Sequence, residues 1–107
     1  MRVLVYEDNL LWSTRIMNAL QTLGHEAELR NEPVPGDADA AIVNLSTQSM
    51  DAPKLVPALD KRGVIVIGHA GHKEKNLLEL GRAAGCHIVA TNSQMTNKLE
   101  QLLDKCT

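Results

Sequence analysis

Short apolar segments alternate with amphipathic segments along this entire 107-residue chain. Short β-branched runs predict buried strands, and apolar residues at three- to four-residue spacing predict helices. The pattern predicts strands at Arg2–Tyr6, His25–Arg30, Asp39–Leu45, Val64–Gly68 and His87–Thr91, and helices at Asn9–Leu23, Pro53–Asp60, Lys73–Ala84 and Ser93–Lys105. Such alternation gives a parallel sheet with helices on both faces. We therefore expect one α/β domain over residues 1–107, a three-layer sandwich with strand order 2-1-3-4-5.

Residues that favour helix ends lie at the boundaries of these segments. Gly24, Gly63 and Gly85 follow the first three predicted helices, and glycine is common just beyond a helix C-terminus. Ser93 stands where an N-cap side chain would accept a hydrogen bond from the next turn. The residues at the helix ends therefore support the predicted helices.

One helix of the regular alternation is missing or very short. Residues 31–38 (NEPVPGDA) are all that joins the second predicted strand to the third, and Pro33, Pro35 and Gly36 exclude a regular helix there. Eight residues span at most about 26–29 Å, which just suffices for the link to pass the first strand and return to the start of the third. Either one sheet face stays thinly covered and the second strand is a lightly protected edge open to another chain, or the link lies over that face.

Composition and charge exclude several classes of function. The net charge is −2 and the basic residues are scattered, so we expect no nucleic-acid partner. No segment has the roughly 20 apolar residues that a membrane span needs, so we expect no membrane partner. Met1 leads directly into a strand, which indicates no signal peptide. Cys86 and Cys106 lack CxxC spacing, and we expect reduced thiols and a cytoplasmic location.

Polar residues follow four of the predicted strands. In a sheet of this strand order, ligands bind at the carboxyl ends of the strands, beside the point where the order changes direction. The side chains expected there are Glu7 and Asp8 after the first strand, Asn44 at the end of the third, His69 after the fourth, and Thr91 and Asn92 after the fifth. We expect any functional site to lie at this edge.

These segments resemble the receiver domains of response regulators, the CheY-like proteins of two-component signalling. The similarity extends over essentially all 107 residues and rests on the segments RVLVYEDN, NLSTQSMDA, VIVIGHA and GCHIVATNS. It implies the flavodoxin-like (CheY-like) fold. It also implies that Glu7 and Asp8 occupy the magnesium-binding positions and that Asn44 occupies the position of the phospho-acceptor aspartate.

The resemblance is weakest at the residues that carry the family's chemistry. Asn44 replaces the acceptor aspartate, His69 replaces the switch hydroxyl, and Thr91 or Asn92 replaces the lysine. An acyl phosphate forms only on a carboxylate nucleophile, with cations neutralising the phosphoryl oxygens. An amide is a poor nucleophile and a neutral metal ligand. We therefore expect no phosphorylation switch, no enzymatic activity and no required cofactor.

Other interpretations of the polar residues remain open. Glu7 and Asp8 can hold Mg²⁺ weakly without a third carboxylate, or they are the solvated end of a strand with Asp8 or Asn9 capping the next helix. His69 is either a pH-sensitive partner of these acids, with a raised pKa, or an ordinary loop residue. With His72 and the two acids it could also form a transition-metal site.

Three large apolar residues lie off the core side of the first predicted helix. Leu10 and Met17 are seven residues apart, and Leu11 is also off that side, so they are candidates for a docking surface. They could equally be half-buried at the sheet rim.

The predicted function is that of an atypical receiver acting in signal transduction by phosphorylation-independent protein–protein contact. Its expected partner is another protein or a second copy of the chain. Because the sequence ends directly after the last helix, we expect no attached output domain. The alternative is a small-molecule or metal-binding domain that uses a pocket around Glu7, Asp8, Asn44 and His69.

Overall fold

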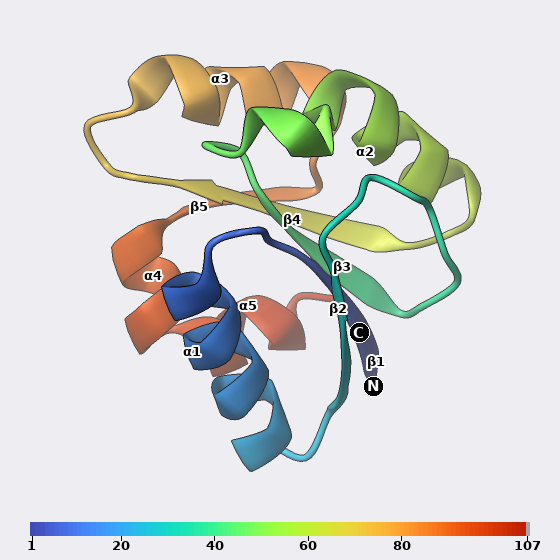
Figure 1. Ribbon diagram of the computed structural model, residues 1–107, viewed down its shortest axis with the longest axis vertical. Coiled ribbons are helices and arrows are strands. Elements are labelled where there is room, and N and C mark those ends of the chain that lie inside the picture. Colours follow the sequence, from blue (N-terminus) through green and yellow to red (C-terminus); the bar gives the residue numbers. More distant parts are fainter. Residues whose placement is uncertain (107) are drawn as a thin grey trace.

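A computed structural model describes residues 1–106 and shows a five-stranded parallel sheet in the order β2-β1-β3-β4-β5 (Figure 1). The strands are β1 (Arg2–Tyr6), β2 (Glu26–Arg30), β3 (Ala40–Asn44), β4 (Ile65–Ala70) and β5 (Ile88–Thr91). The predicted fold class and strand order are confirmed. β4 extends two residues further than predicted, which brings His69 into the sheet opposite Asn44 of β3.

Helices cover both faces of the sheet (Figure 1). They are α1 (Leu10–Thr22), the short 3₁₀ helix η1 (Gln48–Met50), α2 (Ala52–Lys61), α3 (Lys75–Ala84), α4 (Asn92–Asn97) and α5 (Leu99–Asp104). α2 and α3 lie on one face, and α1, α4 and α5 lie on the other. No helix among residues 1–106 is long and apolar enough to cross a membrane.

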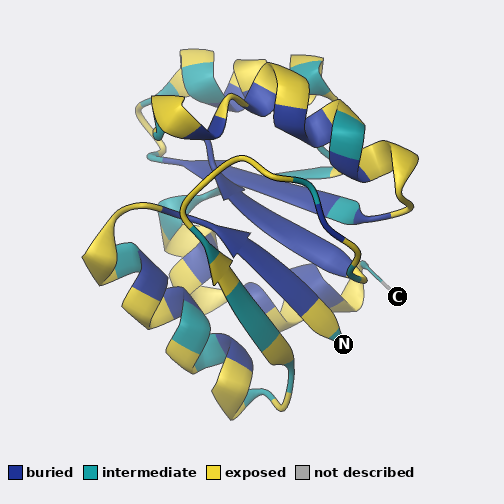
Figure 2. Ribbon diagram, turned by 45° about the vertical axis from the view of Figure 1, so that its right-hand side comes forward, coloured by how far each residue is buried: buried dark blue, intermediate teal, exposed yellow. Residues whose placement is uncertain are grey.

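Alternate residues of the central strands fill two separate hydrophobic clusters. Leu4 of β1 points toward α2 and α3, and its neighbours Val3 and Val5 point toward α1, α4 and α5. β1 and β3 are therefore apolar on both sides, as parallel strands between two helical layers must be. Figure 2 shows the buried residues concentrated in this central sheet. The rigid sheet fixes the positions of the polar residues at its carboxyl edge.

The link between β2 and β3 contains no helix and lies over the sheet face beside α2. The Tyr6 hydroxyl donates a hydrogen bond of 2.7 Å to the carbonyl of Val34, and Arg30 Nη1 donates one of 2.9 Å to the same oxygen. Pro33 and Pro35 line a hollow together with residues of α2. Tyr6 is fully buried as a result. The link therefore covers this face, whereas β2 remains the edge strand of the sheet, as the sequence predicts.

The predicted last helix, Ser93–Lys105, is wrong as a single helix because it is divided at Lys98, where φ is −131°. Thr96 Oγ1 donates to the Asn92 carbonyl four residues back, a bond that bends helices. The predicted cap is also wrong. The N-cap is Thr91, whose hydroxyl accepts from the Gln94 amide while the Gln94 side chain accepts from the Thr91 amide.

Candidate functional site

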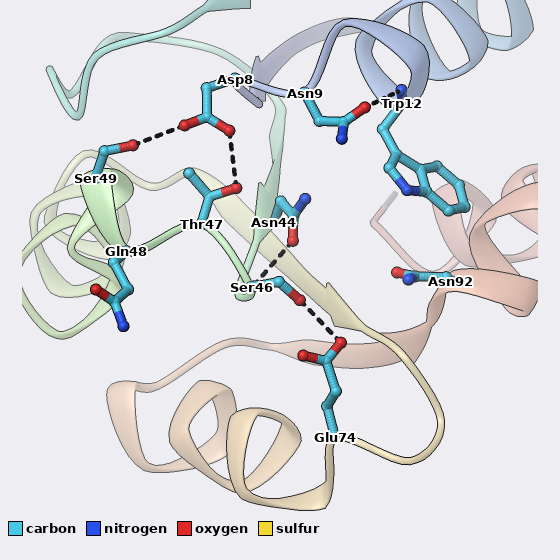
Figure 3. A pocket seen from close by; sticks show the side chains of 10 residues that line it. All are labelled: Asp8, Asn9, Trp12, Asn44, Ser46, Thr47, Gln48, Ser49, Glu74 and Asn92. Carbon is cyan, nitrogen blue, oxygen red and sulfur yellow. Dashed lines mark hydrogen bonds between the residues drawn. The ribbon is translucent and has the colours of Figure 1, made fainter.

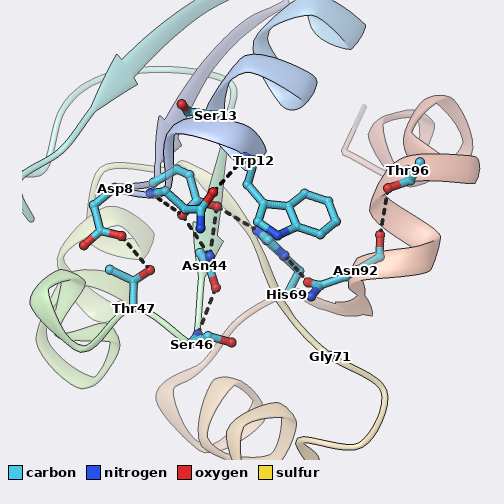
Figure 4. Close-up of polar contacts among 12 residues, drawn as sticks. Asp8, Trp12, Ser13, Asn44, Ser46, Thr47, His69, Gly71, Asn92 and Thr96 are labelled. Atoms are coloured by element: carbon cyan, nitrogen blue, oxygen red, sulfur yellow. Dashed lines mark hydrogen bonds and ion pairs between the residues drawn. The ribbon is translucent and has the colours of Figure 1, made fainter.

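The carboxyl edge of the sheet brings together Glu7, Asn44 and His69, as the sequence predicts. Figure 4 shows Asn44 and His69 at this edge. Asn44 is the last residue of β3 and is paired in register with His69 of β4. Glu7 follows the end of β1, the strand on the other side of β3. Parallel strands end at the same edge, and this is why residues so distant in sequence meet here.

Both the nitrogen and the oxygen of the Asn44 side-chain amide form hydrogen bonds. Its amide nitrogen donates to both carboxylate oxygens of Glu7, at 2.9 and 2.8 Å, and its carbonyl oxygen accepts from the Ser46 amide at 2.9 Å. The two contacts together fix which end of the amide faces Glu7, because a carboxylate accepts hydrogen bonds and a backbone amide donates one. Asn44 therefore acts as a donor toward the carboxylate.

Glu7 is only 1% exposed, so the interpretation of it as a solvated strand end is wrong. Besides the Asn44 amide, its carboxylate accepts a hydrogen bond of 3.2 Å from the Asn9 amide. A buried carboxylate needs such donors because burial without them is costly. Asn9 also caps α1, since its side-chain oxygen accepts from the Trp12 amide, as one alternative predicted.

His69 is fully buried and is not a loop residue. Its Nδ1 lies 2.8 Å from the Asn92 side-chain oxygen, and its Nε2 lies 3.8 Å from a Glu7 oxygen without a hydrogen-bond partner. Burial lowers the pKa of His69, against the opposing effects of the Asn92 hydrogen bond and the Glu7 charge. The expected rise in pKa is therefore wrong, because loss of water outweighs the nearby carboxylate. The imidazole also lies 6.0 Å from the Trp12 ring centre.

Asp8 points away from Glu7 and is exposed. Its two carboxylate oxygens accept hydrogen bonds of 3.1 Å from the hydroxyls of Thr47 and Ser49, one each. Adjacent residues leaving a strand project in different directions, so the two acids do not form one carboxylate pair. Among residues 1–106, no three histidine, cysteine or acidic side chains gather as metal ligands.

A polar cleft of about 570 Å³ opens above these residues (Figure 3). Its lining consists of Asp8, Asn9, Trp12, Asn44, Ser46, Thr47, Gln48, Ser49, Glu74 and Asn92. Among these described residues, Asp8 and Glu74 are the only charged ones. The cleft is therefore electrostatically negative and contains no cation that would hold a phosphoryl oxygen.

The two residues proposed for the lysine position have different surroundings. Thr91 uses its hydroxyl to cap α4, whereas Asn92 lines the cleft and contacts His69. Sequence reasoning missed Glu74, which accepts hydrogen bonds from the Ser46 hydroxyl and the Gly71 amide. Trp12 also lines the cleft. The turn before α3 brings Glu74 to the cleft, so nothing in the spacing of the sequence relates this residue to the third strand.

The predicted docking residues do not all share one environment. Leu10 and Leu11 are 81% and 60% exposed, at the first turn of α1. Met17 is half-buried and packs partly against the core cluster on the sheet face that α1, α4 and α5 cover. The alternative of half-burial therefore applies to Met17 but not to the two leucines.

Solved receiver domains share this architecture. The receiver domain of a sensor histidine kinase from Pseudomonas aeruginosa PAO1, with a magnesium ion coordinated in its active-site cleft, matches with a TM-score of 0.83 and 18% identity, over 97% of this chain and 94% of that one. The chemotaxis response regulator CheY4 of Vibrio cholerae matches with a TM-score of 0.80 and 15% identity, over 99% and 98% of the two chains.

A third similar structure belongs to a family of redox sensors in the streptococci that evolved from two-component response regulators. It matches with a TM-score of 0.77 and 15% identity, over 98% of this chain and 50% of that one. No protein-family model matches the sequence, and no curated protein matches it. Structural likeness at this identity establishes the fold. The chain has the α/β fold of response-regulator receiver (CheY-like) domains.

Proposed function

We propose that this protein is a receiver-like signalling module that works by protein–protein contact without being phosphorylated. The observation that carries the proposal is the side chain of Asn44, which lies at the carboxyl end of β3 and donates to Glu7. By the resemblance to receivers, this is the position of the phospho-acceptor aspartate. We place the module in the cytoplasm, where two-component signalling operates.

The chemistry of this position supports the proposal. Phosphoryl transfer to a side chain requires a nucleophilic oxygen, and the transition state needs positive charge around the equatorial oxygens. Asn44 presents an amide whose nitrogen and oxygen are both engaged. The charged groups in the cleft lining, Asp8 and Glu74, are both negative and would repel a phosphoryl donor.

The residues present do not fit the magnesium site of an active receiver. Mg²⁺ prefers carboxylate oxygens, and both oxygens of Glu7 accept hydrogen bonds from the Asn44 amide. Asp8 remains on the exposed side, but its oxygens are held by two hydroxyls. One exposed carboxylate can bind the ion only weakly, so we assign the protein no required metal.

Intact-mass measurement after incubation with acetyl phosphate and Mg²⁺ tests the proposal. We expect no mass gain for the wild-type protein. A stable adduct of one phosphoryl group would overturn the proposal. A receiver domain with an intact acceptor aspartate, treated in parallel, shows that the reagent is active.

A second candidate function is supported by the cleft itself. It holds about 570 Å³, within the range of small-molecule sites, and Trp12 forms part of its wall. The negative lining favours a neutral polar or cationic ligand. Because Trp12 is the only tryptophan, its fluorescence reports on the cleft directly. A saturable change with a small cation such as arginine amide would support this function. An unchanged spectrum would contradict it, and protein–protein contact would be the one remaining proposal.

A further inference from the structure

The outer edge of β2 has unpaired backbone groups. β2 is the last strand of the sheet and pairs with β1 alone. The Glu26 amide and the Arg30 carbonyl both bond to the segment that contains β1. Backbone groups alternate in direction along a strand, so those of Ala27 and Leu29 point outward. Such an edge can pair with a strand of another chain.

An apolar strip borders this edge on the α1 side of the sheet. Leu29 is 44% exposed, and α1 packs against β2. Leu10 and Met17 are seven residues apart on α1 and share one flank. The other flank carries Trp12 and Ala19, which lie beside Asn92 and Thr96 of α4. The flank with Leu10 and Met17 therefore faces the free edge, where Figure 2 shows β2 as the outermost strand.

The opposite face of β2 carries complementary charges. Glu28 and Arg30 project there and pair with each other at 2.6 Å, and Arg2 also bonds to Glu28. In an antiparallel pairing centred on Leu29, Glu28 of each copy lies directly opposite Arg30 of the other. Opposite charges in such cross-strand pairs are stabilising, and like charges are destabilising. The charges on residues 28–30 of this edge are thus complementary to those of a second copy.

We propose that the chain forms a two-fold symmetric homodimer in which β2 pairs antiparallel with β2 of a second copy. Leu29 exchanges backbone hydrogen bonds with Leu29 of the second copy at the two-fold axis. Because the two-fold axis is perpendicular to the joined sheet, both α1 helices lie on the same face, one on each side of the axis. Leu10 and Met17 then face the other helix. A second copy therefore pairs the free backbone groups, covers the apolar strip and places opposite charges next to each other.

This contact would be the protein–protein contact of the proposed function, but its test involves no phosphoryl transfer, so each can fail independently. The first measurement is sedimentation equilibrium of the full chain over a range of concentrations. We expect association toward twice the chain mass of 11.7 kDa. A strictly monomeric protein would leave the strip to a different partner and would overturn the inference.

Charge reversal tests the register. Glu28→Arg alone and Arg30→Glu alone each place like charges opposite one another in a homodimer, so each variant should become monomeric. An equimolar mixture of the two makes both cross-strand pairs attractive again, and its mass should return to that of a dimer. Glu100→Arg, an exposed change on α5, is the matched control and should associate as the wild type does. A mixture that stays monomeric contradicts the register.

Disulfide trapping covers the case in which a charge variant fails to fold. Leu29→Cys places two thiols at the two-fold axis, where Cα atoms of a hydrogen-bonded pair are about 5.5 Å apart, within the range of a disulfide. Mild oxidation should give a covalent dimer. Leu80→Cys on α3, also partly exposed, is the control and should remain mostly monomeric. Equal cross-linking of the two variants would refute the proposed interface.

Discussion

The side-chain nitrogen of Asn44 lies 2.9 and 2.8 Å from the two carboxylate oxygens of Glu7, at the carboxyl edge of the sheet. Both side chains are buried. In a receiver fold, a carboxylate at position 44 would repel Glu7 unless a cation lay between them. The amide removes that repulsion and supplies a donor instead. Asn44 thus lets the edge of the sheet be stable without metal.

Asn44→Asp should therefore destabilise the protein and make it responsive to metal. The substitution removes the donor and places a second buried carboxyl group against Glu7, which should lower the free energy of unfolding by about 3 kcal/mol in the absence of metal. Mg²⁺ should then raise the melting temperature of the variant but not that of the wild type. Thermal melts with Mg²⁺ and with EDTA measure both effects. Equal responses of the two proteins would contradict this role of Asn44.

Stability should decrease as the pH falls below about 6.5, the pKa of an unperturbed histidine. Burial lowers the pKa of His69 in the folded protein, so between that lowered pKa and 6.5 the unfolded chain binds more protons. Stability from this residue is present above the window and is lost as the pH falls through it. Urea unfolding at several pH values should show this slope.

His69→Leu should reduce that slope. His69→Leu also removes the buried Nε2, which lacks a hydrogen-bond partner. If the His69 variant keeps the wild-type slope, then another group is responsible for it.

The helix cap provides a test of local structure. Thr91→Ala removes the side-chain half of the capping box of α4 and should lower the free energy of unfolding by about 1 kcal/mol. Ser93→Ala, at the cap expected from the sequence, should change it by less than half of that. Chemical denaturation of the two variants compares them directly. A larger loss for Ser93→Ala would place the cap where the sequence suggested.

Tyr6→Phe measures how strongly the link is fastened to the sheet. The Tyr6 hydroxyl donates to the Val34 carbonyl, and burial raises the pKa of this hydroxyl. Its removal should lower the free energy of unfolding by about 1 kcal/mol, because the carbonyl keeps its hydrogen bond from Arg30. Urea unfolding is the measurement. An unchanged stability would show that this bond contributes nothing to fastening the link.

The fold could be predicted because strand and helix periodicity covers the whole chain and leaves few topologies. The meeting of Glu7, Asn44 and His69 followed from the same argument, since each lies at the carboxyl end of a strand. The division at Lys98 could not be predicted, because Met95 and Leu99 keep helical spacing across it. The break depends on backbone angles that the apolar pattern does not encode.

The roles of the two acids also could not be separated in advance. Glu7 and Asp8 are adjacent and chemically alike, yet one is buried under Asn44 and the other is exposed. Which one turns inward depends on the phase of β1 relative to the sheet, and a shift of one residue reverses it. Glu74 joins the cleft through the turn before α3, and its contact with Ser46 has no counterpart in sequence spacing.

The most direct test of the account is the NMR signal of the Asn44 side-chain amide during a titration with Mg²⁺ and beryllium fluoride, a phosphoryl mimic. Because this amide donates to both oxygens of Glu7, we predict that its two proton resonances keep their positions throughout the titration. A saturable shift of these resonances would show that a cation displaces the amide from Glu7. That result would contradict the proposal that Asn44 occupies Glu7 and that the protein works without phosphorylation.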